Sequence, residues 1–311
     1  MSAQHKASGE RVHREAAAVV ESAALPGAHC RLRLRAPLIA ASARPGQFVN
    51  VSPPLDAALL RRPLAVYRSH GGTDIELLFK VVGRGTAALA AVARGDVVDV
   101  IGPLGNGFEL MGEPPETAVL VAGGFGVAPL YPLAAALRGK AKSIVLFVGT
   151  EEELPLETSD SSMHASFVDP SVRVTVTDFE ALGVLARVAS VRRRRGFFEG
   201  LVTDLLEEFL HRGASASAAA HVARGSTQLA KVGSMKVYAC GPWLMLAKTA
   251  AIAAEHGLAC DVLLEERMGC GIGACMSCAV RVFGPDGEPV YARACVEGPV
   301  FDAATVDWKA K

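Results

Sequence analysis

Hydrophobic and polar residues alternate along the first third of the chain, beginning at Cys30. Leu32 and Leu34 alternate there with three arginines, which is the period-two pattern of a half-buried β-strand. Further strand-like segments follow at regular intervals, separated by turns rich in proline and glycine, at residues 47–51, 64–68, 75–82 and 97–101. Closely spaced strands of this kind predict a small antiparallel β-barrel. We expect it over residues 16–112, after a polar, frayed extension over residues 1–15.

The pattern changes after the sequence Glu-Pro-Pro-Glu at residues 113–116, which predicts a linker. Apolar runs then alternate with helix-like segments, as is typical of a parallel sheet covered by helices. The expected strands are residues 118–122, 143–148, 172–177, 236–240 and 260–264. The expected helices are residues 129–137, a short helix from Thr150 with Glu153 completing a capping box, and residues 243–256. This pattern predicts a Rossmann-like parallel α/β domain over residues 117–263 and a small C-terminal module over residues 264–311.

Two segments fit neither pattern. Residues 179–196 end in four consecutive arginines, Arg192–Arg195, and residues 211–235 are rich in alanine and serine with scattered basic residues. A helix-like stretch, residues 202–210, lies between them. Because runs of like charge are usually solvated, we interpret the two segments as a solvent-exposed helix and a flexible insertion. A docking surface or a rebuilt cofactor loop is the functional alternative.

Composition narrows the class of protein. The chain has 311 residues with 32 basic and 32 acidic side chains and an isoelectric point of about 7.1, which disfavours nucleic acid as a partner. Residues 117–137 carry no charge, but three glycines and two prolines interrupt them and predict a strand, a turn and a helix instead of a membrane span. The charged N-terminus is unlike a signal peptide. Seven cysteines without a disulfide framework lead us to expect a cytoplasmic protein.

The most specific chemical signal is a group of cysteines near the C-terminus. Cys270, Cys275 and Cys278 are spaced C-x4-C-x2-C, and Cys295 follows at a distance. This is the plant-type spacing of thiolates that ligate a [2Fe–2S] cluster. The glycines between them suit a chain that wraps closely around a cluster and directs its amides at sulfur. A structural zinc site is the alternative, although zinc usually draws on two C-x2-C pairs and only one is present.

Three further motifs can contribute to ligand binding, and each is weak alone. Arg62 at a strand start and the turn Gly83–Thr86 can together hold a diphosphate. The turn Gly123–Ala128 leads into a helix N-terminus, which favours phosphate, but it lacks the GxGxxG fingerprint, and packing alone would also explain it. Cys240–Pro242 ends a strand at the edge where α/β sheets bind ligands. The acidic run Glu151–Glu153 disfavours a 2′-phosphate and favours NAD over NADP.

These motifs, in this order, resemble the ferredoxin–NADP reductase superfamily and, more narrowly, the electron-transfer subunits of NAD-dependent dihydroorotate dehydrogenases. The similar stretches are PGQF at 45–48, RRPLAV at 61–66, FKVVGRGT at 79–86, GPLGNGF at 102–108, GGFGVAPLYPLA at 123–134, YACGPWLM at 238–245 and LEERMGCGIGACMSC at 264–278. The last stretch is specific, because its cysteine loop adjoins the α/β domain without a full ferredoxin domain.

The resemblance implies roles for individual residues. FAD would be lined by Arg62, Pro63, Leu64, Ala65, Phe79, Lys80, Val81, Gly85 and Thr86. NAD would lie against Gly123, Gly124, Gly126, Cys240, Gly241 and Pro242, and the cluster would be ligated by Cys270, Cys275, Cys278 and Cys295. Two features depart from the family: Ala65 replaces the usual serine beside the reactive edge of the flavin, and an arginine-rich segment replaces a short Gly/Ser-rich loop after Asp178.

The resemblance also implies a function in pyrimidine biosynthesis. A separate FMN-containing catalytic subunit would oxidise dihydroorotate, and electrons would pass from FMN to the cluster, to FAD and to NAD⁺ within a heterotetramer. A flavin would connect NAD with the cluster, because NAD takes a hydride whereas the cluster carries single electrons. Three small units leave no room for a (β/α)8 barrel with its own dihydroorotate site. Alternatives are a reductase subunit of a sulfide dehydrogenase or electron-bifurcating complex, and a non-catalytic redox sensor or zinc-binding protein.

Overall fold

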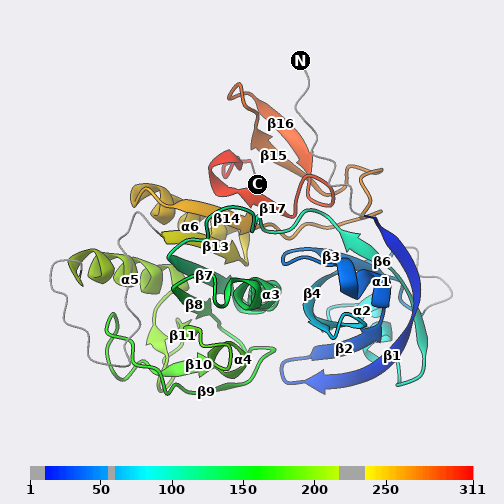
Figure 1. Ribbon diagram of the computed structural model, residues 1–311, viewed down its shortest axis with the longest axis horizontal. Helices are drawn as coiled ribbons and strands as arrows, with labels where there is room; N and C mark the ends of the chain where they lie inside the picture. Colours follow the sequence, from blue (N-terminus) through cyan, green and yellow to red (C-terminus); the bar gives the residue numbers. More distant parts are fainter. Residues whose placement is uncertain (1–10, 55–59, 217–234, 311) are drawn as a thin grey trace.

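The computed structural model of the protein describes residues 11–54, 60–216 and 235–310. Three units follow one another along the chain: a β-barrel, an α/β domain and a small C-terminal module. Figure 1 shows the barrel and the α/β domain side by side, with the C-terminal module over the boundary between them. The predicted fold class is confirmed. Among the described residues, no helix is long and apolar enough to cross a membrane.

Six antiparallel strands close the barrel in the order β1-β2-β5-β4-β3-β6. They are β1 (His13–Leu25), β2 (His29–Arg35), β3 (Phe48–Val51), β4 (Arg62–His70), β5 (Asp74–Lys80) and β6 (Val97–Leu104), with the short helices α1 (Pro37–Ser42) and α2 (Arg84–Ala90) between them. The alternation in the sequence places Leu32 and Leu34 in the barrel core. The predicted frayed extension is wrong for residues 13–15, which pair with β6; residues 1–10 lie outside the described part.

The α/β domain is built on a seven-stranded sheet in the order β12-β11-β8-β7-β13-β14-β17. Its strands are β7 (Thr117–Gly123), β8 (Ser143–Gly149), β11 (Leu185–Ser190), β12 (Phe198–Glu199), β13 (Met235–Cys240), β14 (Ala259–Leu263) and β17 (Val300–Asp302). Neighbouring strands are parallel except for β17, which the C-terminal module adds antiparallel to β14. The sheet therefore joins the two units into one core.

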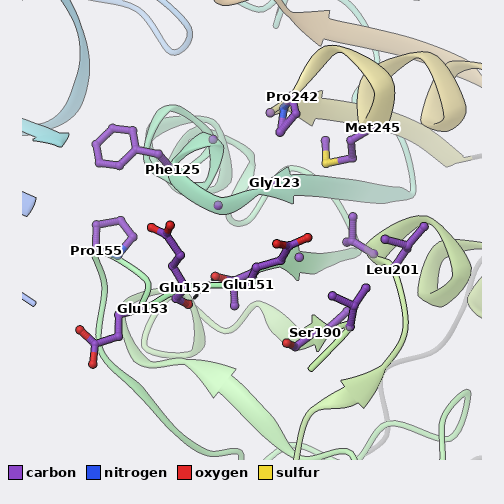
Figure 2. A pocket seen from close by; sticks show the side chains of 18 of the residues that line it. Gly123, Phe125, Glu151, Glu152, Glu153, Pro155, Ser190, Leu201, Pro242 and Met245 are labelled. Carbon is purple, nitrogen blue, oxygen red and sulfur yellow. Dashed lines mark hydrogen bonds between the residues drawn. The ribbon is translucent and has the colours of Figure 1, made fainter. Parts of the chain in front are cut away.

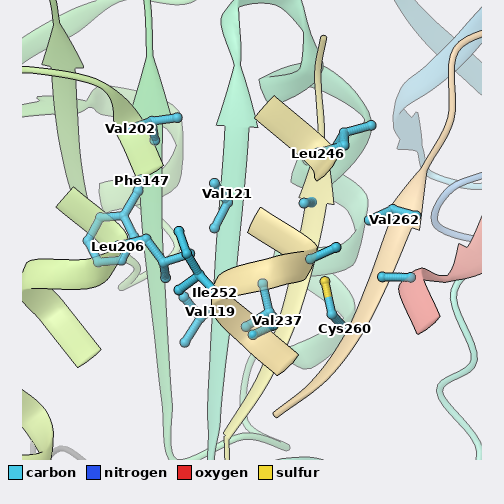
Figure 3. Close-up of a cluster of buried hydrophobic side chains, with 14 of the residues drawn as sticks. Val119, Val121, Phe147, Val202, Leu206, Val237, Leu246, Ile252, Cys260 and Val262 are labelled. Carbon is cyan, nitrogen blue, oxygen red and sulfur yellow. The ribbon is translucent and has the colours of Figure 1, made fainter. Parts of the chain in front are cut away.

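Helices cover both faces of this sheet. On one face, α5 (Val202–Ala216) and α6 (Trp243–Glu255) bury apolar side chains that include Phe147, Leu206 and Ile252 (Figure 3). On the other face, α3 (Val127–Leu137) packs over Leu120 and Leu146. Odd- and even-numbered residues of β7 and β8 thus belong to different apolar layers, because successive side chains of a strand point to opposite faces. Buried on both faces, these strands are apolar throughout, as the sequence predicted.

The third strand of the parallel sheet was predicted in the wrong place. Within the predicted segment, residues 172–177, lies β10 (Val174–Val176), which pairs with β9 (Thr158–Asp160) in a separate two-stranded antiparallel sheet. The parallel strand is β11, inside the segment that we interpreted as a solvated helix. All six residues of β11 are buried, including Arg187. A buried arginine interrupted the apolar run and so obscured the strand.

Two helix predictions in this domain have different outcomes. The helix predicted from Thr150 is wrong: the segment is irregular with bends, and the Thr150 hydroxyl donates to the carbonyl of Glu152 at 2.6 Å. The helix-like stretch at residues 202–210 is confirmed as part of α5. A short helix, α4 (Thr177–Glu180), follows β10. Residues 217–234, most of the predicted insertion, lie outside the described residues.

The C-terminal module contains the cysteine loop, the hairpin β15 (Ala279–Phe283) and β16 (Pro289–Arg293), the sheet strand β17 and a 3-10 turn, η3 (Ala303–Thr305). β15 and β16 pair antiparallel. The loop precedes the hairpin and Cys295 follows it, so the hairpin returns the chain to the loop. The long sequence separation of the fourth cysteine is thereby explained.

Candidate functional site

The cysteine loop folds around its own sulfur atoms. The Sγ of Cys270 accepts hydrogen bonds from the backbone N–H groups of Ile272 (3.5 Å) and Ala274 (3.3 Å). Gly271 and Gly273 have φ angles of 71° and 87°, in the left-handed region that other residues adopt only with strain. The two glycines let the chain turn sharply enough to point successive amides at one thiol.

The other three thiols differ in exposure but lie together. Cys275 is exposed, whereas Cys278 and Cys295 are buried. Hydrogen bonds from the hydroxyl and backbone of Ser277, and from Cys270, lower the pKa of Cys275 to about 6. Burial, followed by the neighbouring thiols of Cys278 and Cys270, raises the pKa of Cys295 to about 12. The hairpin therefore brings the distant Cys295 beside the thiols of the loop.

The chemistry of this site fits an iron–sulfur cluster. Four thiols with amides directed at two of them match the four-cysteine ligation of [2Fe–2S] clusters and the hydrogen bonds that set their potential. Among the described residues, no three His, Cys, Asp or Glu side chains come together tightly enough for a single metal ion; a [2Fe–2S] cluster distributes four thiolates over two irons. Ile272 and Met276 are exposed beside the thiols, so the loop reaches the protein surface.

A pocket of about 380 Å³ lies between the barrel and the start of the C-terminal module. Seven of the nine residues predicted to line FAD border it: Arg62, Pro63, Leu64, Ala65, Phe79, Lys80 and Thr86. Val81 and Gly85 do not border it. Gly85 packs against the Arg62 guanidinium, which leaves no space for a Cβ. The opposite wall is formed by residues 263–266 and Met268, immediately before the cysteine loop.

A second pocket, of about 490 Å³, lies at the carboxyl ends of β7, β8, β11 and β13 (Figure 2). Parallel sheets characteristically bind ligands at this edge. Five of the six residues predicted to contact NAD border the pocket: Gly123, Gly124, Gly126, Gly241 and Pro242. Cys240 does not border it. Its side chain is fully buried, and this burial raises the pKa of the thiol well above its ordinary value.

Close backbone packing shapes the floor of this second pocket. A Cβ at Gly126 would overlap the carbonyl of Cys240, and Gly241 combines a φ of 157° with backbone contact to Gly123. The turn after β7 and the turn after β13 are therefore pressed together, and their N–H groups can approach a phosphate closely. Glu151, which follows β8, stands on the facing wall (Figure 2).

The two pockets are neighbours. Lys80, Phe125 and Glu265 border both of them. The Nζ of Lys80, on the barrel, also forms an ion pair of 2.5 Å with Glu152 of the α/β domain. Ligands in the two pockets would share this wall.

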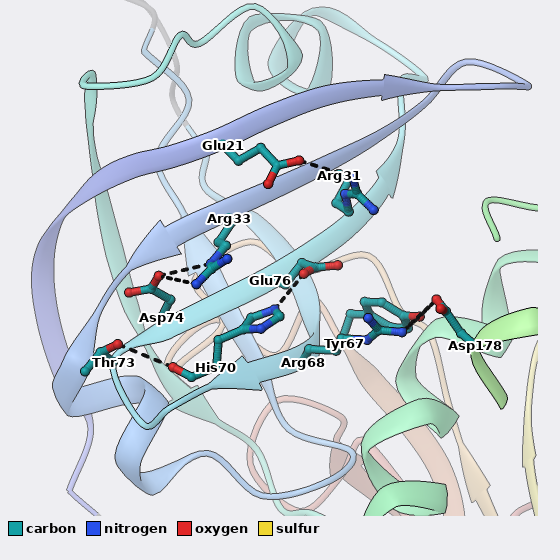
Figure 4. A network of polar contacts seen from close by, with 10 residues as sticks. All are labelled: Glu21, Arg31, Arg33, Tyr67, Arg68, His70, Thr73, Asp74, Glu76 and Asp178. Atoms are coloured by element: carbon teal, nitrogen blue, oxygen red, sulfur yellow. Dashed lines mark hydrogen bonds and ion pairs between the residues drawn. The ribbon is translucent and has the colours of Figure 1, made fainter. Parts of the chain in front are cut away.

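A polar cluster fixes the barrel to the α/β domain near the pockets (Figure 4). The Tyr67 hydroxyl donates to the Asp178 carboxylate at 2.5 Å, and Arg68 forms an ion pair with the same carboxylate at 2.7 Å. The Arg68 guanidinium lies over the rings of Tyr67 and Tyr131, 4.7 and 4.2 Å from their centroids. Burial, followed by the bond to Asp178, raises the pKa of Tyr67. β4, which lines the first pocket, is thus held against α3, which begins directly after the glycine turn of the second pocket.

Comparison with known proteins places the chain in a family. It is 34% identical, over 88% of its own length and 90% of the relative's, to the dihydroorotate dehydrogenase B (NAD(+)), electron transfer subunit, of Desulforamulus reducens. It is 33% identical to the protein of the same name from Geobacillus thermodenitrificans, with 95% of this chain and 99% of the relative covered. The chain belongs to this family.

Further matches agree with membership of the dihydroorotate dehydrogenase B electron transfer subunits. Residues 265–307, which include all four thiols, match the iron-sulfur cluster binding domain of dihydroorotate dehydrogenase B. Among solved structures, the NADH-dependent reduced ferredoxin-NADP oxidoreductase, studied for flavin-based electron bifurcation, aligns with a TM-score of 0.70 at 26% identity over 95% of this chain and 91% of its own. A ferredoxin NADP+ reductase from Neisseria gonorrhoeae shares the fold (TM-score 0.53, 12% identity, 80% of this chain and 92% of that chain).

Sequence reasoning missed several residues that border the pockets. Phe125 and Glu265 border both pockets, and Ser190 and Val191 border the second. The last two were missed because β11 was not recognised as a strand. A signal was present, since four of the six residues of β11 are alanine, leucine or valine. Phe125 and Glu265 lie within stretches that resemble the family, but a pocket wall shared by two domains has no sequence signature.

Proposed function

We propose that this chain is the electron-transfer subunit of a dihydroorotate dehydrogenase in pyrimidine biosynthesis, relaying electrons from a partner subunit through a [2Fe–2S] cluster and FAD to NAD⁺. The observation that carries the proposal is the continuity of three sites. Residues 263–266 and Met268 form a wall of the first pocket, here called the barrel pocket, and lead directly into the thiol site. The barrel pocket in turn shares Lys80, Phe125 and Glu265 with the second pocket, here called the α/β pocket.

Separate groups of residues would bind FAD and NAD. Arg62 would neutralise the diphosphate of FAD, because a guanidinium offers bidentate donors to phosphate, while Leu64 and Phe79 offer apolar surface to its ring system. The glycine turns at residues 123–126 and 241 would hold the phosphates of NAD with backbone N–H groups. The bound flavin supplies the conversion between hydride and single-electron transfer. In place of the family's serine, Ala65 contributes no hydroxyl beside the flavin, so backbone groups take its part.

We infer that the partner is an FMN-containing catalytic subunit, assembled with this chain in a cytoplasmic heterotetramer, and that this chain has no dihydroorotate site of its own. The exposure of Cys275, with Ile272 and Met276 also exposed beside it, supports a partner at the thiol site, because an electron donor must approach the cluster closely. The free thiols Cys30 and Cys260 are buried and support a reducing compartment.

The structural match to the NADH-dependent reduced ferredoxin-NADP oxidoreductase favours a second candidate, a reductase subunit of an electron-bifurcating complex. The identity of the donor separates the two candidates. Cluster reduction by dihydroorotate through a catalytic subunit supports the first, and reduction by a ferredoxin partner instead supports the second.

Anaerobic purification followed by flavin, iron and acid-labile sulfide analysis tests the cofactor content. We expect about one FAD, two irons and two sulfides per chain, with flavin absorption bands over broad iron–sulfur absorption. A colourless protein that contains zinc would overturn the relay.

A further inference from the structure

The whole chain contains two asparagines, Asn50 and Asn106, and both bind the C-terminal module from the barrel side. We propose that they are positioning residues that fix the geometry between the cluster and the flavin. Each holds one half of the thiol site on the barrel: Asn50 holds the cysteine loop, and Asn106 holds the segment that follows Cys295. The inference rests on the proposed function, which supplies the two redox groups.

The direction in which Asn50 points follows from the alternation of β3. Val49 and Val51 belong to the barrel core, whereas Phe48 packs in the apolar layer that contains Cys278 of the C-terminal module. Because residues i and i+2 of a strand share a face, Asn50 lies on the same side as Phe48. The barrel therefore presents one buried amide toward the thiol site.

Asn50 contacts the cysteine loop at its first ligand. Its Nδ2 donates to the carbonyl of Cys270 at 3.0 Å, and the residue is 1% exposed. Gly271 packs on the same amide so closely that a Cβ would overlap Nδ2. On the neighbouring strand, Pro63 lies opposite Asn50 and borders the flavin pocket. One side chain thus joins the backbone of a cluster ligand to a strand pair that borders the flavin pocket.

Asn106 holds the other half of the site. Its Nδ2 donates to the carbonyls of Glu297 (2.8 Å) and Val300 (3.1 Å), and its Oδ1 accepts from the N–H of Val300 (3.1 Å). Its backbone N–H donates to the carbonyl of Gly298 at 2.7 Å. These partners closely follow Cys295, so the segment that carries the fourth thiol is fixed to the loop that leaves β6.

Arg293 connects the two halves. Its backbone N–H and its Nε donate to the Glu297 carboxylate at 2.7 and 3.0 Å, and another guanidinium nitrogen donates to the carbonyl of Gly273 in the cysteine loop at 2.9 Å. The segment held by Asn106 therefore also supports the loop held by Asn50. Groups behind the ligands orient them and tune a metal site, and electron transfer slows steeply as donor and acceptor separate. Loss of the hydrogen bonds from Asn50 or Asn106 would therefore change both the potential of the cluster and the rate of electron transfer to it.

The two asparagines call for different substitutions. The Oδ1 of Asn50 is buried and has no hydrogen-bond partner among the described residues. Asn50→Leu removes the bond to Cys270 but also an unsatisfied acceptor, so the cost of leaving the Cys270 carbonyl without its donor is partly offset. Asn106→Asp keeps the acceptor for Val300 but loses both side-chain donations. Thr249→Val is the matched control, because it removes another buried oxygen without a partner in the described residues, far along the chain in α6.

The test uses the full chain, purified anaerobically, with flavin and iron content, the EPR spectrum and midpoint potential of the reduced cluster, and the stopped-flow rate at which NADH reduces the cluster. We expect Asn50→Leu and Asn106→Asp to retain flavin but to show a shifted EPR spectrum or potential and a rate roughly tenfold lower or more. Thr249→Val should match the unsubstituted protein in every measurement.

Two outcomes overturn the inference alone: unchanged cluster properties and rate in both asparagine variants, or the same losses in Thr249→Val as in the asparagine variants. An unsubstituted protein that binds neither flavin nor iron would instead overturn the proposed function, and this inference with it.

Discussion

The Tyr67 hydroxyl of the barrel donates a 2.5 Å hydrogen bond to the carboxylate of Asp178 in the α/β domain. Both partners also contact Arg68, so three polar groups meet at the boundary between the two units that carry the pockets. The bond is formed by a tyrosine that is 1% exposed. It therefore contributes to the relative placement of the two pockets as well as to stability.

Tyr67→Phe should lower the free energy of unfolding by about 1 kcal/mol, whereas Asp178→Ala should cost about 2 kcal/mol because it also leaves the Arg68 charge half-buried without its carboxylate. Urea unfolding of the two variants measures these values. The double variant should lose less than the sum of the single losses, since both changes remove the same bond. Additive losses would show that the two residues are not coupled.

Substitution of any one ligand thiol should remove the cluster while leaving the flavin bound. We expect Cys270→Ser and Cys295→Ser to fall below about a tenth of the unsubstituted iron and sulfide content, because a four-cysteine site needs all its thiolates. Cys260→Ser is the control, as Cys260 is a buried core residue of β14. Iron retained in Cys295→Ser would show that the distant thiol is not a ligand.

The glycine turn of the α/β pocket gives a steric prediction. Gly126→Ala places a methyl group against the Cys240 carbonyl, so the turn must shift and NADH should reduce the flavin at least about tenfold more slowly. Flavin content should stay unchanged. Gly257→Ala is the control, since Gly257 follows α6 away from both pockets, a Cβ there meets open space, and the strain from its φ of 65° stays local to that turn. Equal kinetics in the two variants would contradict a dinucleotide site at the Gly126 turn.

The barrel carries a pH-dependent contribution to stability. Burial opposes ionisation of Asp74, but hydrogen bonds from Arg35, Thr73 and Arg33 outweigh it and lower the pKa of the carboxyl group. An aspartate in an unfolded chain titrates at about pH 3.9. The carboxylate therefore stabilises the fold above about pH 4, and this contribution is lost as the pH falls through the lowered pKa of the folded state.

Asp74→Asn should accordingly lower the free energy of unfolding by about 2 kcal/mol at pH 7, and the difference from the unsubstituted protein should shrink below about pH 4. Urea unfolding between pH 3 and 8 measures it. Glu21→Gln breaks an exposed ion pair with Arg31 and should cost less than about 1 kcal/mol. A difference for Asp74→Asn that does not change with pH would exclude this carboxyl as the titrating group.

The order of the three units could be predicted from the sequence because hydrophobic periodicity changes from alternating to continuous at the linker. The cysteine spacing likewise predicted four thiols that the structure brings together. Local patterns failed where tertiary contacts decide. Arg187 looked like part of a solvated segment, but its guanidinium donates to the carbonyls of Ala186 and Met163 inside the core. Thr150 had the spacing of a helix cap, yet its hydroxyl donates to the carbonyl of Glu152, in a segment that forms no helix.

Contacts between the units had no sequence signal at all. Asn50 and Cys270 are 220 positions apart, and Tyr67 and Asp178 are 111 apart. Taken alone, Asn50 and Tyr67 are ordinary polar side chains on strands, and Asp178 is one on a helix. Whether these residues meet depends on how the three units pack against one another, and the local patterns of the sequence do not indicate that packing.

Electron relay through the cluster and FAD to NAD⁺ is tested most directly by co-purifying this chain with an FMN-containing dihydroorotate dehydrogenase subunit. The measurement is dihydroorotate-dependent formation of NADH. NADH should form with the pair and with neither chain alone, and pairs that contain Cys270→Ser or lack FAD should lose at least about 99% of the rate, because the relay has no other path. Full NADH formation by a pair that lacks the cluster or FAD of this chain would contradict the account.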